Sequence, residues 1–136
     1  MKIGEAAAVA GLTVKTVRYY ADIGLVAPAG RDPASRYRDY GPGEVAKLNL
    51  VRRARSFGFS VDECRNLVAL FENERRASAD VKALALEKRA ALDAQLEELQ
   101  ALRRALDGMI DACPGDERSN CAILDGLSGA ARKAAG

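Results

Sequence analysis

The chain has 136 residues, 49% of them hydrophobic and 29% charged, which suits one or two small folded units rather than an enzyme with a large core. Three cysteines, an odd number, argue against a secreted disulfide framework, and no apolar run approaches the ~20 residues of a membrane span. We expect a cytoplasmic protein without a signal peptide or membrane contact. With no histidine, phosphate loop or nucleophile–base constellation, it is predicted not to be an enzyme.

Charge is distributed unevenly along the chain. Residues 1–60 contain ten Lys/Arg and five Asp/Glu, whereas residues 61–136 contain eleven Lys/Arg and fourteen Asp/Glu. The basic first part suits a surface that contacts the phosphates of a nucleic acid, whereas the acidic second part is expected to contact something else.

Two short helices joined by a glycine turn are predicted over residues 3–10 and 14–23. Gly11 can take the left-handed conformation that ends the first helix, and Thr13 is a good N-cap for the second. On the second helix the 3.6-residue period places Lys15, Arg18, Tyr19 and Asp22 on one face, with Val17 and Tyr20 opposite. This is the pattern of a helix–turn–helix with a basic recognition face.

The segment from residue 25 to residue 40 lacks helical periodicity and is predicted to form a wing. It ends in the basic, tyrosine-bearing run Arg-Tyr-Arg-Asp-Tyr, residues 36–40, which could be a short extended segment. Arginine can bind guanine bidentately, and hydroxyl groups and cations can hold phosphates. The candidate DNA-binding residues are Thr13, Val14, Lys15, Arg18, Tyr19, Tyr20, Arg31, Arg36, Tyr37 and Arg38.

Three further helices are predicted in the rest of the chain, before a short terminal one near Ile123. One begins at Pro42 and breaks at residues 57–59, and a capping box at residues 60–63 begins the next. The third runs from about residue 79 to 112, after a possible cap at Ser78, with apolar residues spaced mostly three and four apart. Lys88 and Gln95 interrupt this stripe. Because a lone helix with one apolar stripe is unstable in water, a homodimer is predicted.

The cysteines fall into two classes. Cys64 lies on the apolar face of its helix and is interpreted as a small buried hydrophobe. Cys113 and Cys121 bracket a polar loop of seven residues, which leaves a metal site, a disulfide or chance as explanations. Zinc prefers four ligands, and nearby carboxylates such as Asp116 would complete its site poorly, whereas Cu(I) is satisfied by few thiolates.

The combined pattern resembles the MerR family of transcription regulators. The resemblance rests on Gly-Leu-Thr at residues 11–13, Thr-Val-Arg-Tyr-Tyr at 16–20, Gly-Leu-Val at 24–26, the run at 36–40 and Gly-Phe-Ser at 58–60. It covers residues 1 to about 72 and implies a winged helix–turn–helix domain. It also implies a dimer that binds promoter double-stranded DNA between the −35 and −10 elements. Effector binding then distorts this DNA, so that RNA polymerase is affected indirectly.

The tail resembles the copper-efflux (CueR/HmrR-like) branch of that family, through Ala-Cys-Pro-Gly-Asp at residues 112–116 and Cys-Ala-Ile-Leu at 121–124. Mercury- and zinc-sensing relatives have a cysteine at the start of the dimer helix, where this chain has Ser78. The resemblance therefore implies a sensor of Cu(I), with Ag(I) or Au(I) as alternative ligands, held by Cys113 and Cys121. Ser78 and Lys82 are candidate neighbours of the site, because two thiolates and one monovalent ion leave a negative charge.

We therefore expect a mainly α protein with four segments. Residues 1–72 form the winged helix–turn–helix domain, 73–112 a connector and an antiparallel coiled-coil dimerisation helix, 113–128 a metal-binding loop with a short helix, and 129–136 a disordered tail. The expected function is activation of copper efflux or resistance genes. A sensor of a divalent metal or of thiol redox state, a cytosolic copper chaperone and a structural coiled-coil adaptor remain alternatives. Neither the chaperone nor the adaptor would need the basic N-terminal face.

Overall fold

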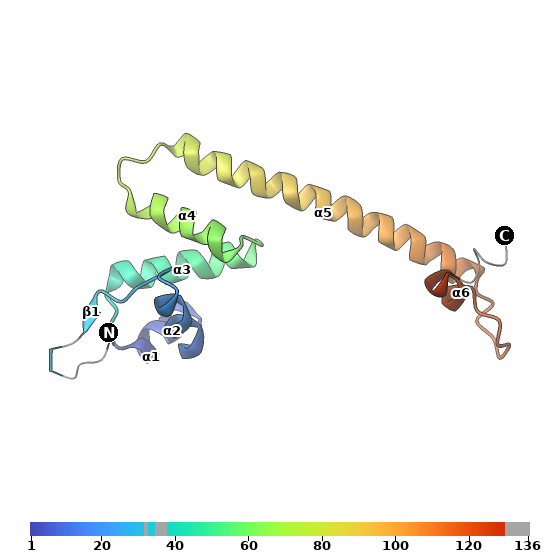
Figure 1. Ribbon diagram of the computed structural model, residues 1–136, viewed down its shortest axis with the longest axis horizontal. Coiled ribbons are helices and arrows are strands. Elements are labelled where there is room, and N and C mark those ends of the chain that lie inside the picture. Colours follow the sequence, from blue (N-terminus) through green and yellow to red (C-terminus); the bar gives the residue numbers. More distant parts are fainter. Residues whose placement is uncertain (32, 35–37, 130–136) are drawn as a thin grey trace. The chain divides into compact units, whose positions relative to one another are not determined.

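The computed structural model describes residues 1–31, 33, 34 and 38–129, and the protein is mainly helical, as predicted. Its elements in chain order are α1 (Ile3–Ala10), α2 (Val14–Asp22), β1 (Gly30–Arg31), β2 (Arg38–Asp39), α3 (Pro42–Ser56), α4 (Val61–Glu72), α5 (Ser78–Ala112) and α6 (Ala122–Ser128) (Figure 1). In the described part of the chain, no helix combines the length and apolar character needed to cross a membrane.

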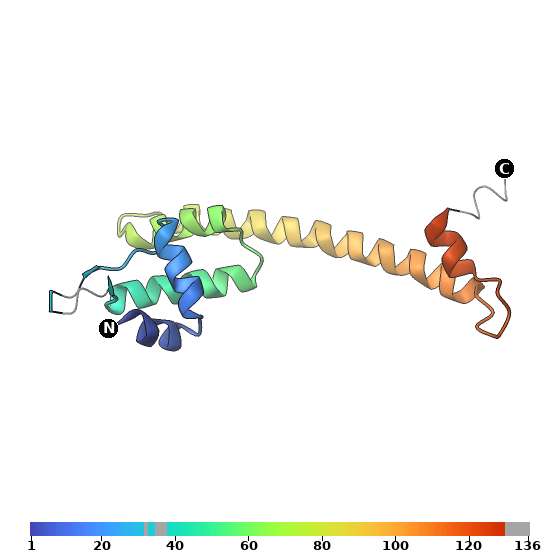
Figure 2. The same ribbon diagram turned by 60° about the horizontal axis from the view of Figure 1, so that its bottom comes forward.

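The chain divides into two compact units, Met1–Lys88 and Arg89–Gly136. The packing boundary therefore lies within α5, whereas the sequence suggested residue 72 as the end of the first domain. The core lies in the first unit, where α1, α2 and α3 pack side by side (Figures 1 and 2). Its largest fully buried side chains are those of Tyr40, Leu48, Val17, Val26, Val51 and Cys64.

The turn between α1 and α2 forms as the sequence predicts. Gly11 has a φ of 70°, in the left-handed region where a side chain is strained. Thr13 is the N-cap of α2, and its Oγ1 accepts a hydrogen bond of 3.1 Å from the backbone N–H of Thr16. Val17 and Tyr20 are buried against the neighbouring helices. The opposite face of α2, with Lys15, Arg18 and Tyr19, is exposed to solvent.

The wing is a two-stranded antiparallel sheet. Gly30 pairs with Asp39 and Arg31 with Arg38, and an isolated bridge joins Lys2 to Asp39. The extended segment predicted at residues 36–40 is therefore confirmed at Arg38 and Asp39.

A tight turn joins α3 to α4, and its caps match the sequence prediction. Ser60 and Glu63 form a reciprocal capping box: the Glu63 N–H donates to Ser60 Oγ at 3.1 Å and the Ser60 N–H to Glu63 Oε1 at 2.8 Å. Gly58 takes a φ of 90°, which only glycine adopts without strain. The capping box and the conformation of Gly58 thereby fix the turn between α3 and α4.

The described part of the second unit consists of most of α5, a loop at residues 113–121 and α6, and none of these residues belongs to the buried core. α5 runs over 35 residues, with bounds close to those predicted, although Ser78 is its first residue rather than a cap before it. Neither α5 nor α6 has a buried residue. Leu92, Leu96, Leu99, Leu102, Leu106, Ile110, Leu124 and Leu127 are all exposed in the protomer.

Candidate DNA interface and metal centre

The exposed face of α2 carries the candidate DNA contacts. Lys15, Arg18 and Tyr19 are exposed, and half of the Tyr19 surface is accessible. Thr13 and Val14 are also exposed, at the N-terminal end of the helix. Recognition helices present residues from their N-terminal part to a DNA groove, and these five exposed side chains are therefore the candidate contacts.

Arg38 connects the wing to the end of α2. Its Nη2 lies 3.4 Å from Asp22 Oδ1, and the side chain is partly buried. Burial raises the pKa of the Tyr40 hydroxyl, and the positive charge of Arg38 nearby partly offsets this effect. Within the part of the chain that the structure describes, neither Arg38 Nη1 nor Tyr40 Oη has a hydrogen-bond partner. Arg38 therefore orients the wing on α2, in addition to any contact with phosphate.

One of the candidate DNA contacts, Tyr20, is corrected by the structure. For three others the structure does not describe the side chain. Tyr20 has only 7% of its surface exposed and belongs to the core, because its position on α2 is opposite to that of Arg18. The Arg31 backbone lies in β1, but its side chain is outside the description. Arg36 and Tyr37 lie outside the described residues.

The two C-terminal cysteines are brought together by a loop that turns back at the end of α5. Cys113 directly follows α5, and its N–H donates to Ile110 O at 3.1 Å; Cys121 is the N-cap residue of α6. The two Sγ atoms lie 4.0 Å apart, and both cysteines are free and partly exposed. Two soft donors are thus placed side by side at an accessible position.

The electrostatic environment of Cys121 favours its thiolate form. The backbone N–H groups of Leu124 and, more weakly, Ile123 at the beginning of α6 lower the pKa of the Cys121 thiol, as does its contact with Cys113. Burial raises the pKa of the Cys64 thiol, which is fully enclosed in the core. The thiolate is the form that binds metal, so Cys121 is better suited to bind a metal than Cys64 is.

No third ligand joins the two sulfurs among the described residues, where no group of three or more His, Cys, Asp or Glu is arranged to hold a metal. Asp116 is engaged by Arg118, whose Nε lies 2.8 Å from Asp116 Oδ2. Ser78 begins α5 and Cys113 follows its end, so the two lie at opposite ends of one helix. The two-thiolate donor set fits a soft ion of low coordination number better than zinc.

One contact between α5 and α6 was missed by the sequence analysis. Gly126 of α6 packs against Met109 near the end of α5, and a Cβ at residue 126 would lie 2.6 Å from Met109 Sδ. Glycine in the interior of a helix lowers its stability, so Gly126 was the available signal. The contact places α6, and with it Cys121, beside the end of α5 (Figure 2).

Comparisons with known proteins agree with this architecture. The family model "MerR HTH family regulatory protein" matches residues 1–70, and "MerR, DNA binding" matches residues 45–109. The regulator HmrR of Rhizobium leguminosarum bv. viciae is 48% identical over 128 residues, covering 94% of this chain and 98% of the relative. The regulator CueR of Escherichia coli O157:H7 is 42% identical over 136 residues, covering both chains completely.

A solved structure is similar over nearly the whole chain. The transcription regulator PbrR691 of Ralstonia metallidurans CH34, in complex with lead(II), matches with a TM-score of 0.79 and 32% identity over 93% of this chain and 98% of that one. The relatives are regulators and not enzymes. The chain belongs to the MerR family of helix–turn–helix proteins and is a metal-responsive transcriptional regulator.

Proposed function

We propose that this protein is a Cu(I)-responsive activator of copper efflux or resistance genes, with Ag(I) and Au(I) as alternative ligands. The observation that carries the proposal is the pair of free, accessible thiols of Cys113 and Cys121, whose sulfurs are 4.0 Å apart. Two metal–thiolate bonds of about 2.3 Å each span at most about 4.6 Å, so one ion can be shared with little movement of the loop.

The number of ligands supports a monovalent ion. Within the described residues no group of three or more Cys, His, Asp or Glu is arranged to hold a metal, and Ser78 stands where a thiol-bearing relative would supply a further ligand from the start of α5. Soft monovalent ions accept two thiolates, whereas a divalent ion of the same kind calls for more donors.

The proposed site carries a net negative charge that needs compensation, because two thiolates and one monovalent ion sum to minus one. The backbone N–H groups at the beginning of α6 compensate part of this negative charge at Cys121. We assign the rest to the N-terminal end of α5 from the second copy, where Ser78 lies at the positive end of the helix dipole and Lys82 follows one turn later.

The proposed DNA interface is the exposed face of α2 together with the wing. Lys15, Arg18 and Tyr19 contact promoter DNA, and the homodimer formed through α5 presents two such faces to the two halves of an operator. Bound Cu(I) would tie Cys113 to Cys121 and so order the loop between them. Ile123, Leu124 and Leu127 then pack on the long helix of the second copy, which biases the position of the DNA-binding units on the promoter.

The test is a titration with Cu(I) and Zn(II) under competing chelator and reductant, followed by in vitro transcription with the same proteins. Cys113→Ser and Cys121→Ser are expected to keep metal-free promoter binding and to lose Cu(I)-induced transcription, since one sulfur alone leaves no two-coordinate site. Cys64→Ala, which removes a thiol from the core instead, should still respond to Cu(I). Undiminished activation of either serine variant would disprove the assignment.

The competing functions give different results in the same assay. A response to Zn(II) or Pb(II) that exceeds the response to Cu(I) would identify a divalent-metal sensor. Activation by oxidant without metal would identify a thiol-redox sensor. The variant Ser78→Cys sharpens the comparison, because a third thiol near the pair should extend the response toward divalent ions.

A further inference from the structure

Lys88 is a charged residue in the apolar stripe of α5, and it is almost buried. Its side chain is only 14% exposed in the protomer, although seam positions farther along α5, such as Leu99, are exposed. Removing an ammonium group from water costs free energy unless it is paired. The contacts of Lys88 therefore explain why the stripe is interrupted at this residue.

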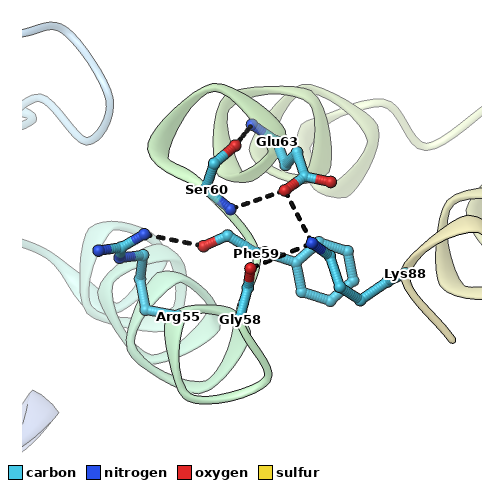
Figure 3. A network of polar contacts seen from close by, with 6 residues as sticks. All are labelled: Arg55, Gly58, Phe59, Ser60, Glu63 and Lys88. Carbon is cyan, nitrogen blue, oxygen red and sulfur yellow. Dashed lines mark hydrogen bonds and ion pairs between the residues drawn. The ribbon is translucent and has the colours of Figure 1, made fainter. Parts of the chain in front are cut away.

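Lys88 contacts the turn between α3 and α4 through three groups (Figure 3). Its Nζ donates to the carbonyl oxygen of Gly58 at 3.1 Å and to Glu63 Oε1 at 3.0 Å. The same Nζ lies 5.2 Å from the centroid of the Phe59 ring, within the range of a cation–π contact. A single ammonium group thus binds a carbonyl, a carboxylate and an aromatic face of one turn.

The turn that receives Lys88 is rigid in its own right. Arg55 Nη1 donates to Phe59 O at 3.0 Å, and the capping box fixes Ser60 and Glu63 to each other. The pKa of Glu63 is lowered first by the backbone N–H of Ser60 and then by Lys88, so its carboxylate stays charged at neutral pH. A rigid acceptor makes the bonds of Lys88 directional, and they attach the first part of α5, up to Lys88, to the turn between α3 and α4.

An apolar pocket at the first part of α5 is less specific in direction. Val81, two turns before Lys88, lines a shallow apolar pocket together with Leu67 and Phe71 of α4. Apolar packing is non-directional and allows sliding, whereas hydrogen bonds to a carbonyl and a carboxylate do not. Lys88 is also the last residue of the first unit, after which α5 continues without contributing to the core.

We propose that Lys88 is the positioning residue that sets the orientation of the DNA-binding unit on the dimerisation helix. The ammonium group locks α5 to the turn between α3 and α4, and α3 packs directly against α1 of the helix–turn–helix. In the homodimer the two recognition helices then have a defined separation and rotation. This inference rests on the dimer of the proposed function, but it does not depend on which metal is sensed.

The experiment measures how strictly the metal-free dimer discriminates between operator spacings. An operator is selected in vitro from random DNA with the wild-type protein, and versions are made with one or two base pairs added or removed between its half-sites. One added base pair rotates a half-site by about a tenth of a turn, so a rigid dimer binds it less well than a loose one. Affinities are compared for wild type, Lys88→Met, Lys88→Arg and Arg89→Met.

Lys88→Met removes the charge and keeps the alkyl chain beside Phe59. It is expected to reduce the preference for the best spacing over the one-base-pair insertion by about fivefold or more, the lower end of typical coupling factors. Lys88→Arg should restore most of the preference, since a guanidinium can reach the same acceptors. Arg89→Met, which removes a charge from the exposed neighbour on the same helix, should leave the preference unchanged.

Three results would overturn the proposal: an unchanged spacing preference of Lys88→Met, an equal loss of affinity at every spacing, or the same loss in Arg89→Met. If Lys88→Met does not yield a folded dimer, Glu63→Gln is judged by the same criteria, because it keeps an oxygen acceptor for Ser60 and loses only the charge. No metal is present in this assay. A protein that fails to respond to Cu(I) but loses spacing preference at Lys88 would refute the proposed function and leave this inference standing.

Discussion

The two units of the chain place their large aliphatic residues in opposite environments. In Met1–Lys88, Leu48 and Val51 of α3 have no exposed surface and pack inside a core of small and aliphatic side chains. In Arg89–Gly136, Leu99 and Leu102 are each at least 60% exposed. Since burying one leucine contributes about 1.5–3 kcal/mol, the first unit is stabilised by its own packing and the second is not.

This difference shows which part of the protein needs a second copy. Exposed apolar residues spaced three and four apart along α5 form a stripe that another helix can cover, and a matching stripe exists on every other copy of the chain. We therefore expect the first unit to be stabilised by its own core and the second to be stabilised by association with a second copy. The predictions below test this contrast, from the largest expected effect to the smallest.

The largest effect is expected for a charge placed in the stripe. Leu99→Asp should convert the wild-type dimer to a monomer at micromolar concentration, because the carboxylate would be buried without a partner at a cost of several kcal/mol. Sedimentation velocity measures the change. Gln100→Asp adds the same charge beside the stripe and should remain dimeric; a monomeric wild type would show that α5 is not the dimer seam.

Replacing one leucine by alanine in each unit distinguishes packing within one protomer from packing between two protomers. Leu48→Ala should destabilise the protein by about 2–5 kcal/mol at every protein concentration, since it opens a cavity in a closed core. The effect of Leu102→Ala should grow as the protein is diluted, because it weakens association. Denaturant unfolding at two concentrations a hundredfold apart measures both. If the effect of Leu102→Ala did not depend on protein concentration, the leucines of the second unit would not be buried between two protomers.

The exposed face of α2 is expected to bind DNA through Arg18. Arg18→Ala should weaken specific promoter binding by about 1–3 kcal/mol, the value of one charge-assisted contact to a base. Arg104→Ala removes an equal charge from the exposed surface of α5 and should change promoter affinity little. Fluorescence anisotropy at physiological salt decides, and wild-type affinity of Arg18→Ala would show that α2 is not the recognition helix.

A smaller loss of stability is expected at the cap of α4. Ser60→Ala removes the acceptor of the Glu63 N–H and should lower the free energy of unfolding by about 1 kcal/mol. Ser56→Ala is the matched control, because the Ser56 hydroxyl donates to Arg53 O near the end of α3 and caps no N-terminus. If both variants lost the same free energy of unfolding, the Ser60 cap of α4 would contribute no more to stability than the Ser56 hydroxyl does.

The smallest effect is a pH dependence at Glu63. Its pKa is lowered in the folded protein by the Ser60 N–H and by Lys88, so its stabilising contribution is present above the unfolded pKa near 4.5. That contribution is lost as the pH falls through the lower folded pKa. The difference in unfolding free energy between wild type and Glu63→Gln should therefore narrow below pH 4.5; a constant difference from pH 7 to pH 3 would contradict this assignment.

Much of the local structure was predictable because it depends on neighbours in sequence. Gly11, Thr13 and the pair Ser60–Glu63 act over three or four residues, and each behaves in the structure as expected. The family followed from the same motifs, since residues 11–40 and 58–60 carry its pattern. Tyr20 was assigned wrongly among the DNA contacts, because residue type was weighed above its position on the buried face of α2.

By itself the sequence determined the helices, the basic recognition face, the apolar stripe of α5 and the two cysteines at its end, because periodicity, caps and composition are local properties. Only the tertiary structure showed that Lys88 donates hydrogen bonds to the turn between α3 and α4, since its partners lie 25 and 30 residues away in the chain. The 4.0 Å separation of the Cys113 and Cys121 sulfurs is likewise a product of packing. It depends on how the loop turns back and on the contact of Gly126 with Met109, and no residue spacing specifies that geometry.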